Sequence, residues 1–207
     1  VEINPKNVKI AKKIFGSKAN ICCADFLKDS EKCFRQFSVS TFDIIIGNPP
    51  FNEGGVGKGG GVLWKEFVFK SFELLNNKGF LCFIHPTGWR KPPGERASAG
   101  DVWVEFKKHN LIFLKISDKK IPNFPTVDYY VVQKNAPQKE THLINEFENN
   151  KFEGKISLYD LDFIPHFINN DIKTILNKVF SKSGEKFTII RNQSFQPTKK
   201  DMEHKGT

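Results

Sequence analysis

The chain has 207 residues, of which 39% are hydrophobic and 27% charged, the proportions of an ordinary globular protein. It contains no run near the roughly 18 apolar residues that a membrane span needs and no signal-peptide pattern at its start, so we expect no membrane association. A formal net charge of +9 favours a polyanionic partner such as nucleic acid, although many basic proteins have none.

The first half of the chain alternates strand-like and helical segments. The pair Asn4-Pro5 supplies an N-cap and a first helical residue, and Gly16 is a natural end for the helix that follows. The predicted elements are a strand end at residues 1–3, a helix over 5–15, a strand over 20–24, a weaker helix over 30–37 and a strand that starts at 42.

Residues 42–51 carry the most informative pattern. Three consecutive isoleucines suit a parallel strand that is buried on both faces. Pro49 and Pro50 lack an N–H group, so the hydrogen-bond ladder must stop there, and each favours extended geometry in the residue before it. We therefore expect Asn48 and Phe51 at the carboxyl end of a core strand, where open α/β sheets bind ligands.

A glycine-rich loop over 52–61 follows this strand. Such a loop is mobile until a partner orders it, which would suit a lid that closes on DNA. A solvated linker explains the composition equally well. The loop lacks the G-x-x-x-x-G-K-[ST] pattern, which argues against a phosphate cradle.

The second half continues the alternation. Its predicted elements are a helix over 62–76, a strand over 80–84, a short helix over 102–108 and strands over 111–116 and 127–132. Repeated strand–helix units predict an α/β fold with a mostly parallel sheet and crossover helices. The short link between the last two strands allows an antiparallel final hairpin.

The character of the chain changes near residue 137, where it becomes polar and rich in Asn and Lys. A helix over 168–180 and a strand over 187–190 are predicted there. We therefore divide the chain into a first domain over 1–136 and the beginning of a second, C-terminal domain over 137–207.

The loop that leaves the strand over 80–84 is basic. Arg90, Lys91 and Arg96 could contact DNA phosphates, and a solvated basic loop is the alternative. We expect the nearby Trp89 and Trp103 to be packing residues.

The four cysteines, at positions 22, 23, 33 and 82, form no C-x-x-C pair, and the five histidines stand apart. We expect buried, reduced thiols in an intracellular protein rather than a zinc site or a disulfide. We assign no metal.

Acidic or polar residues stand at the ends of three successive strands: Glu2, Asp25 and Asn48, evenly spaced by one strand–helix unit. In a doubly wound sheet these strand ends line one edge. A carboxylate there can accept the hydroxyls of a ribose, a second can accept an exocyclic amine, and Phe26 can lie against a purine. A solvated loop carboxylate is the alternative for Glu2 or Asp25 taken singly.

With these features together, the sequence resembles the S-adenosylmethionine-dependent DNA adenine N6-methyltransferases of restriction–modification type. The matching segments are residues 1–5, 24–27, 42–51 with its Asn-Pro-Pro-Phe motif, 79–86 and 123–127. The resemblance covers roughly residues 1–135. It implies a Rossmann-like methyltransferase sheet and a site-specific, adenine-specific DNA methyltransferase of class EC 2.1.1.72.

For the cofactor, S-adenosyl-L-methionine, the resemblance implies three binding residues on the first two strands. Glu2 would bind the ribose hydroxyls and Asp25 the adenine amine, with Phe26 beside the adenine ring. Asn48 would border the same cofactor site.

For the target base, the resemblance implies a catalytic motif formed by Asn48, Pro49, Pro50 and Phe51. The side-chain oxygen of Asn48 and the carbonyl of Pro49 would accept the two N6 hydrogens of a flipped adenine. Phe51 would stack on that base, with Phe124 on its second face.

One part of the family pattern is absent. The first strand and its glycine loop, which grip the methionine part of the cofactor, have no counterpart here, so we expect these residues alone to bind the cofactor weakly or not at all. The expected partner is double-stranded DNA in the cytoplasm, or in whichever intracellular compartment holds the DNA, with a restriction endonuclease as a partner or a fused nuclease domain.

Three other functions fit parts of the pattern. Methylation of a protein glutamine or of an RNA adenine would use similar chemistry, and a catalytically dead nucleic-acid-binding remnant would lack it. The basic charge, the Phe124 segment and the appended C-terminal region favour DNA.

Overall fold

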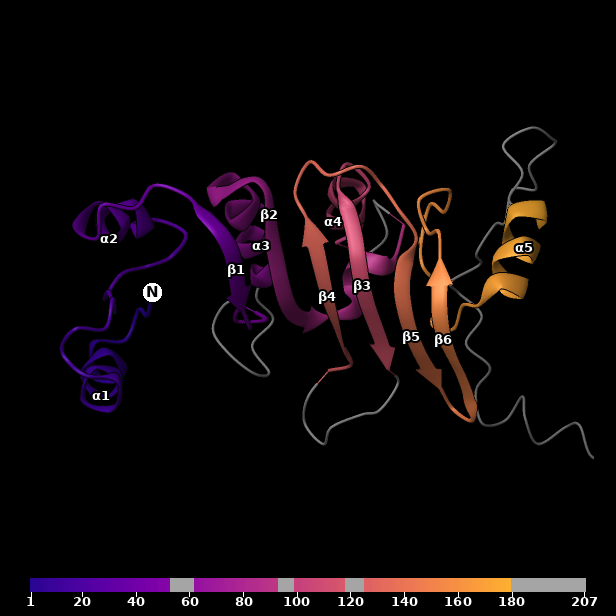
Figure 1. The fold of residues 1–207 in the computed structure, drawn as a ribbon. Helices are drawn as coiled ribbons and strands as arrows, with labels where there is room; N and C mark the ends of the chain where they lie inside the picture. The colour runs from indigo at the N-terminus through magenta and orange to yellow at the C-terminus, as the bar shows by residue number, and fades with distance from the viewer. Residues whose placement is uncertain (53–61, 93–98, 118–124, 180–207) are drawn as a thin grey trace, which may run out of the picture.

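A six-stranded sheet forms the centre of the structure (Figure 1). The computed structural model describes residues 1–52, 62–92, 99–117 and 125–179. The helices are α1 Pro5–Phe15, α2 Ser30–Gln36, α3 Leu63–Leu74, α4 Gly100–Phe106 and α5 Asn170–Val179, with a 3-10 helix η1 at Thr87–Arg90. The strands are β1 Phe42–Gly47, β2 Leu75–Pro86, β3 Asn110–Ser117, β4 Val127–Gln133, β5 Thr141–Phe147 and β6 Asn150–Ile156.

The strand order is β1-β2-β4-β3-β5-β6. β1 pairs with β2, and β3 with β5, in parallel, whereas β4 is antiparallel to both of its neighbours and β6 is antiparallel to β5. β1, β2, β3 and β5 therefore share one direction. The predicted mostly parallel α/β sheet with an antiparallel β3–β4 hairpin is confirmed.

The first helix begins and ends as its sequence predicts. The side chain of Asn4 accepts a hydrogen bond from the backbone N–H of Lys6, Pro5 is the first helical residue, and Gly16 follows the last turn with a φ of 85°. A side chain is strained at such an angle, so a glycine suits this helix end.

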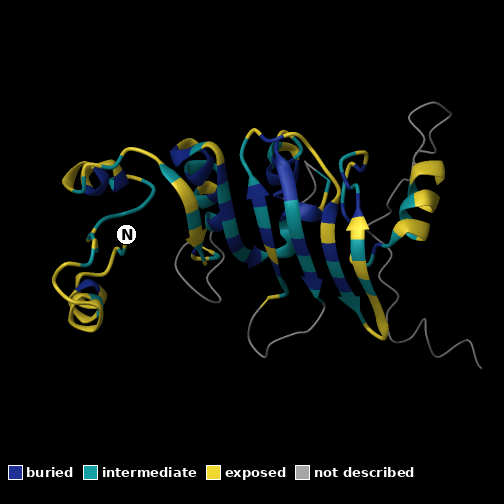
Figure 2. Ribbon diagram, viewed as in Figure 1, coloured by how far each residue is buried: buried dark blue, intermediate teal, exposed yellow. Residues whose placement is uncertain are grey.

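The hydrophobic core lies between the sheet and the helices α3 and α4, as the dark residues in Figure 2 show. Aromatic rings dominate it, because Trp89, Trp103 and Phe106 are fully buried and the rings of Trp103 and Phe106 both contact that of Trp89. Tyr130 of β4 packs edge-on against Phe106. The expectation that Trp89 and Trp103 are packing residues is confirmed.

Residues 141–156 join the same sheet as strands β5 and β6. The segment after them also packs on the core, since Trp103 Nε1 donates a hydrogen bond to the carbonyl of Leu161. These residues belong structurally with the first part of the chain, and the position at which a second domain begins stays a prediction.

The N-terminal limb, residues 1–36, lies beyond β1 (Figure 1). The strand predicted over 20–24 is reduced to one parallel bridge, between Glu2 and Cys23. In the described ranges β1 pairs only with β2, so β1 is the edge of the sheet. Its predicted burial on both faces is wrong, because Ile44 is 57% and Ile46 77% exposed at this edge.

Apolar contacts attach the limb to α3 and to the start of β1. The ring of Phe26 stacks on that of Phe67 of α3, with centroids 5.2 Å apart. Cys33 and Phe34 of α2 are buried together with Leu74 at the end of α3. The limb also contacts the sheet, because the ring of Phe34 packs edge-on against that of Phe42 in β1 with centroids 4.9 Å apart. It is thus held through α2 and residue 26, against both α3 and β1.

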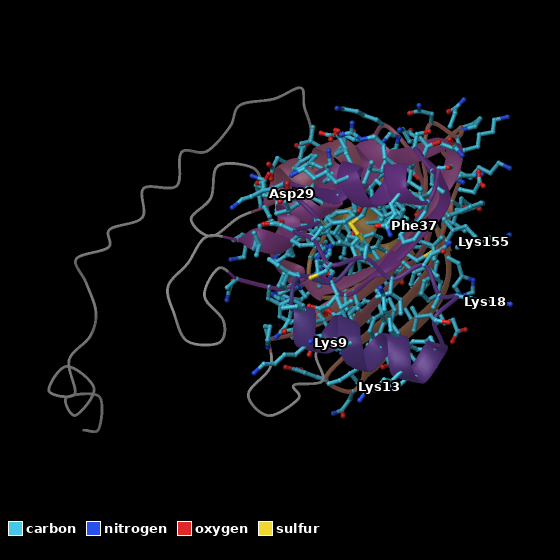
Figure 3. The ribbon with its side chains drawn as sticks, turned by 90° about the vertical axis from the view of Figure 1, so that its left-hand side faces the viewer. Lys9, Lys13, Lys18, Asp29, Phe37 and Lys155 are labelled. Carbon is cyan, nitrogen blue, oxygen red and sulfur yellow. A yellow bond between two sulfur atoms is a disulfide. The ribbon has the colours of Figure 1, made fainter. Side chains whose placement is uncertain are left out.

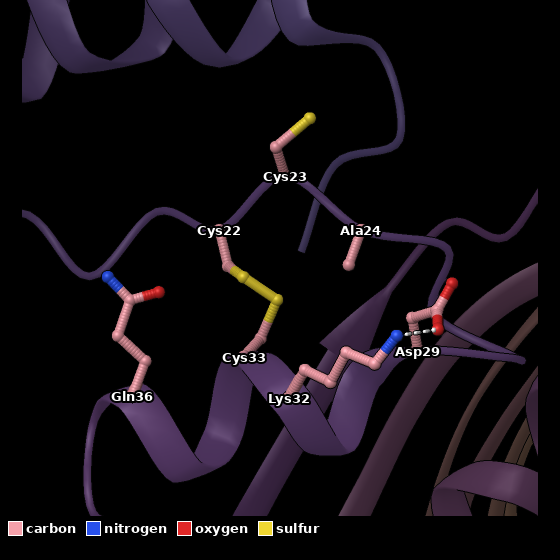
Figure 4. A pocket seen from close by; sticks show the side chains of 7 residues that line it. All are labelled: Cys22, Cys23, Ala24, Asp29, Lys32, Cys33 and Gln36. Atoms are coloured by element: carbon pink, nitrogen blue, oxygen red, sulfur yellow. Dashed lines mark hydrogen bonds and ion pairs between the residues drawn. A yellow bond between two sulfur atoms is a disulfide. The ribbon is translucent and has the colours of Figure 1, made fainter.

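A disulfide adds a covalent link within the limb and corrects the expectation of four reduced thiols. Cys22 and Cys33 are bonded, with their Cα atoms 5.7 Å apart. The bond spans a cavity of about 310 Å³ lined also by Cys23, Ala24, Asp29, Lys32 and Gln36 (Figure 4). It ties the segment that pairs with Glu2 to α2.

We expect Cys33→Ser to lower the free energy of unfolding by about 2–4 kcal/mol, because the unfolded chain gains the freedom that the cross-link removes. Cys23→Ser is the matched control, since this neighbouring thiol is exposed and forms no disulfide, and it should cost less than about 0.5 kcal/mol. Urea unfolding without reductant measures both. Equal stabilities, with four alkylatable thiols in the unreduced protein, would contradict the disulfide.

Candidate active site

The exit of β1 forms a rigid polar turn. The β1–β2 ladder ends at the pair Gly47 and Phe83, and the two prolines that follow Asn48 have no N–H group with which to extend it. Gly47 is required by close packing, because a Cβ atom there would lie 2.9 Å from the ring of Phe83. Asn48 is exposed and, within the described residues, its side-chain amide has no hydrogen-bond partner.

The residues after Asn48 are anchored. Pro49 is buried, and the half-buried ring of Phe51 packs against the core. The backbone carbonyl of Phe51 accepts a hydrogen bond from the N–H of Leu63 at 3.3 Å, and Asn52 pairs with residue 62. One exposed amide, the backbone of Pro49 and one fixed aromatic ring therefore stand within four residues at a strand end.

Glu2 and Asp25 are each held by a local hydrogen bond. Glu2 Oε1 accepts from the N–H of Asn4 at 2.7 Å, and Asp25 Oδ1 accepts from the N–H of Leu27 at 2.9 Å. In the described part of the chain the second oxygen of Glu2 has no hydrogen-bond partner, and that of Asp25 lies 3.9 Å from Lys28 Nζ. Each carboxylate thus has an oxygen available for a hydroxyl or amine.

The structure brings some of the predicted site residues together and leaves others apart. Glu2 hydrogen-bonds to the segment just before Asp25, through Glu2 N to the Cys22 carbonyl and Ala24 N to the Glu2 carbonyl. Phe26, next to Asp25, stacks on Phe67. These residues lie on the N-terminal limb, whereas Asn48 to Phe51 lie on the sheet. They do not form the regular row of adjacent strand ends that the sequence predicts.

Several predicted features lie outside the described residues. They are Phe124, Arg96, most of the glycine-rich loop (53–61) and the strand over 187–190.

The prediction that Arg90 contacts phosphate is wrong. Arg90 is only 4% exposed, and its Nε donates to Asp128 Oδ2 at 2.8 Å. Its Nη1 donates to the carbonyl of Pro165, and Trp89 Nε1 donates to the same oxygen of Asp128 at 2.9 Å. Arg90 therefore joins η1 to β4 and to the segment before α5.

Burial raises the pKa of Asp128 from 3.8 to about 6, against the opposing effect of the Arg90 guanidinium. Its other oxygen, Oδ1, has no hydrogen-bond partner among the described residues. Sequence reasoning missed this pair, although Asp128 occupies an inward position in the period-two pattern with Tyr130 and Val132. An acid at such a position needs a buried partner.

A second buried polar group, His85, lies near the end of β2. It is fully buried, with Nδ1 3.0 Å from the carbonyl of Pro86 and Nε2 2.9 Å from the hydroxyl of Tyr130. Burial lowers the pKa of His85 from 6.5 to about 4, although the hydrogen bond with Pro86 opposes the shift. The imidazole is therefore neutral near pH 7.

Two features are absent from residues 1–52, 62–92, 99–117 and 125–179. No helix in them combines the length and apolar character needed to cross a bilayer. No group of three or more His, Cys, Asp or Glu side chains gathers there as a metal site would require.

Comparison with known proteins gives matches of three kinds. A family model, the Eco57I restriction-modification methylase, matches residues 1–121. An uncharacterized adenine-specific methylase of Mycoplasma pneumoniae (strain ATCC 29342 / M129 / Subtype 1) is 28% identical over 164 residues, which cover 74% of this chain and 30% of that protein. The crystal structure of the M protein of the type I restriction enzyme EcoKI has a similar fold, with a TM-score of 0.50 and 14% identity over 69% of this chain and 34% of that one. The chain spans about a third of the length of these two proteins.

The two shifted pKa values predict opposite effects of pH on stability. Asp128 binds its proton more tightly in the folded protein than in the unfolded chain. Its contribution to the free energy of unfolding is therefore complete below pH 3.8 and is lost as the pH rises to about 6. His85 binds its proton less tightly in the folded protein than in the unfolded chain. Its contribution to the free energy of unfolding is therefore complete above pH 6.5 and is lost as the pH falls to about 4.

We therefore expect Asp128→Asn to make the free energy of unfolding rise more steeply with pH between 4 and 6, by up to roughly 1.4 kcal/mol per pH unit. His85→Phe should change the slope in the opposite direction. Urea unfolding at pH 4, 5 and 6 measures these slopes. Parallel curves for the wild type and both variants would contradict the assignment.

Proposed function

The chain belongs to the Eco57I restriction-modification methylase family, and we propose that it carries the target-base half of the active site of a DNA adenine N6-methyltransferase that uses S-adenosyl-L-methionine. The observation that carries this proposal is the exit of β1. There the Asn48 amide, which has no partner among the described residues, the carbonyl of Pro49 and the ring of Phe51 are presented on a backbone that two prolines and the core hold in place.

The chemistry of an aromatic amine explains why this arrangement is useful. The lone pair of adenine N6 is delocalised into the ring, so the amine is a poor nucleophile. Asn48 Oδ1 and the Pro49 carbonyl would accept its two hydrogens, favour pyramidal geometry and aim the lone pair. The reaction then depends on orientation and electrostatics rather than on a nucleophilic side chain.

Stacking supplies the second part of the site. A base inside a duplex does not reach such a pocket, so the target adenine would be flipped out of the helix. Phe51 would stack on its face, at about 1–3 kcal/mol per base, with Phe124 on the other face. The packing of Phe51 against the core supports this role, because the ring is already held before a base arrives.

The carboxylates of the limb fit the cofactor as hydrogen-bond acceptors. S-adenosyl-L-methionine supplies the methyl group when bound. Glu2 would hold the ribose hydroxyls and Asp25 the adenine amine, each through the oxygen that its local hydrogen bond leaves available. Phe26, fixed on Phe67, would border the adenine, and Asn48 would separate the two halves of the site.

The charge of the limb supports a nucleic-acid partner. Its first helix and the following turn carry five exposed lysines: Lys6, Lys9, Lys12, Lys13 and Lys18. Figure 3 shows the face of the molecule on which Lys9 and Lys13 of α1 lie. We assign double-stranded DNA as the partner, in the cytoplasm, with a restriction endonuclease acting on the same sequence as a separate or fused unit.

The test uses the protein expressed from its complete reading frame in a host that lacks adenine methylation. Digestion of the host DNA to nucleosides, followed by mass spectrometry, should detect N6-methyladenine. We expect Asn48→Ala to lower the methylation rate by about 10²–10³-fold, because the loss of one well-placed polar group has an effect of this size in other enzymes. Asn150→Ala, at an exposed residue of β6, is the matched control and should leave the rate unchanged.

Two outcomes would contradict the proposal. Unmodified DNA adenine in the wild type would exclude the DNA substrate, and the same digestion of RNA and of protein glutamine would then test the two related chemistries. Full methylation by Asn48→Ala would exclude the role of this amide.

A further inference from the structure

His85 stands beside the exit of β1. In the parallel β1–β2 pair Gly47 lies opposite Phe83. Two residues further along the chain from each of them stand Pro49 and His85, respectively. His85 is fully buried, so it does not touch a substrate. Its influence must pass through the groups that it contacts.

The hydrogen bonds of His85 determine its tautomer. The carbonyl of Pro86 can only accept, so the proton lies on Nδ1 and donates across the 3.0 Å contact. Nε2 of the neutral ring is then an acceptor, and the hydroxyl of Tyr130 donates to it at 2.9 Å. The ring is held at both nitrogens, by its own strand and by the neighbouring strand β4.

The flat face of this ring supports the start of α3. The ring of Trp64 stacks on His85 with centroids 3.9 Å apart and an angle of 13° between the planes. Trp64 is buried and follows Leu63, whose N–H donates to the carbonyl of Phe51. A path of direct contacts thus leads from Tyr130 through His85 and the start of α3 to Phe51.

We propose that His85 is a positioning residue. By fixing Trp64 at the start of α3, it keeps the ring of Phe51 and the Asn48 amide in their positions relative to each other. This inference rests on the proposed function. His85 takes no part in proton transfer, because both of its nitrogens are used in the core.

The test compares His85→Phe, which keeps a flat ring against Trp64 but loses both hydrogen bonds, with the wild type. His109→Phe is the matched control. His109 is also buried and its ring lies 4.5 Å from an aromatic ring of α3, that of Phe72 near the other end of the helix. Both variants remove a buried hydrogen-bonded imidazole, so both should lower the melting temperature.

Only His85→Phe should change the site. We expect the rate constant for methyl transfer at saturating DNA and cofactor to fall about 10- to 100-fold, with the dissociation constant for S-adenosyl-L-methionine within about twofold of the wild type. Tyr130→Phe should act in the same direction, and the double variant should equal His85→Phe alone, because the two residues share one hydrogen bond. His109→Phe should keep the wild-type rate.

Hydrogen exchange of the Leu63 amide gives a readout independent of activity. It should be at least about 10-fold faster in His85→Phe and unchanged in His109→Phe, because the bond to Phe51 opens more often when Trp64 is not held. Unchanged exchange, or equal rates of methyl transfer in the two variants, would overturn the proposal. If the wild type made no N6-methyladenine, the proposed function would fail, and the Leu63 exchange would still decide whether His85 positions Phe51.

Discussion

The candidate site depends on how a parallel strand pair ends. β1 and β2 are hydrogen-bonded from Ile44 to Gly47, and the next residues, Asn48, Pro49 and Pro50, include two that have no N–H group to donate. The chain is thereby released from the sheet at a fixed place and in an extended conformation. The backbone that carries the exposed Asn48 amide is therefore held in place before any ligand binds, which would suit the proposed reaction because that reaction depends on orientation.

Buried polar pairs hold the structure behind this exit. Arg90 and Asp128 form an ion pair with almost no exposure to water, and such a pair stabilises a fold only when its remaining hydrogen-bonding groups are satisfied. Here Trp89 and the carbonyl of Pro165 supply further bonds, but Asp128 Oδ1 has no partner among the described residues. The pair connects η1, β4 and the segment before α5. His85 and Tyr130 form a neutral counterpart nearer to the site. The part of the chain after residue 156 therefore contributes to the support of the site, although it lies far from it in sequence.

The sequence predicts what depends on local chemistry. The cap of α1, the proline-terminated strand and the β3–β4 hairpin follow from residues that are neighbours in the chain, and all three are present. Features that depend on distant partners were missed. The basic loop around Arg90 reads as solvated because Asp128 lies 38 residues away, and Cys22 meets Cys33 only when α2 packs beside the limb. The edge position of β1 depends on which strands pair with it, which a run of isoleucines does not encode.

The proposed site can be tested by a crystal structure of the protein from its complete reading frame, with a duplex containing its recognition sequence and a non-reactive analogue of S-adenosyl-L-methionine. The account predicts a target adenine outside the duplex, with N6 about 2.7–3.2 Å from both Asn48 Oδ1 and the Pro49 carbonyl oxygen and the base stacked on Phe51. An adenine whose N6 lies beyond hydrogen-bond reach of both oxygens, or a base that stacks on another side chain, would contradict it.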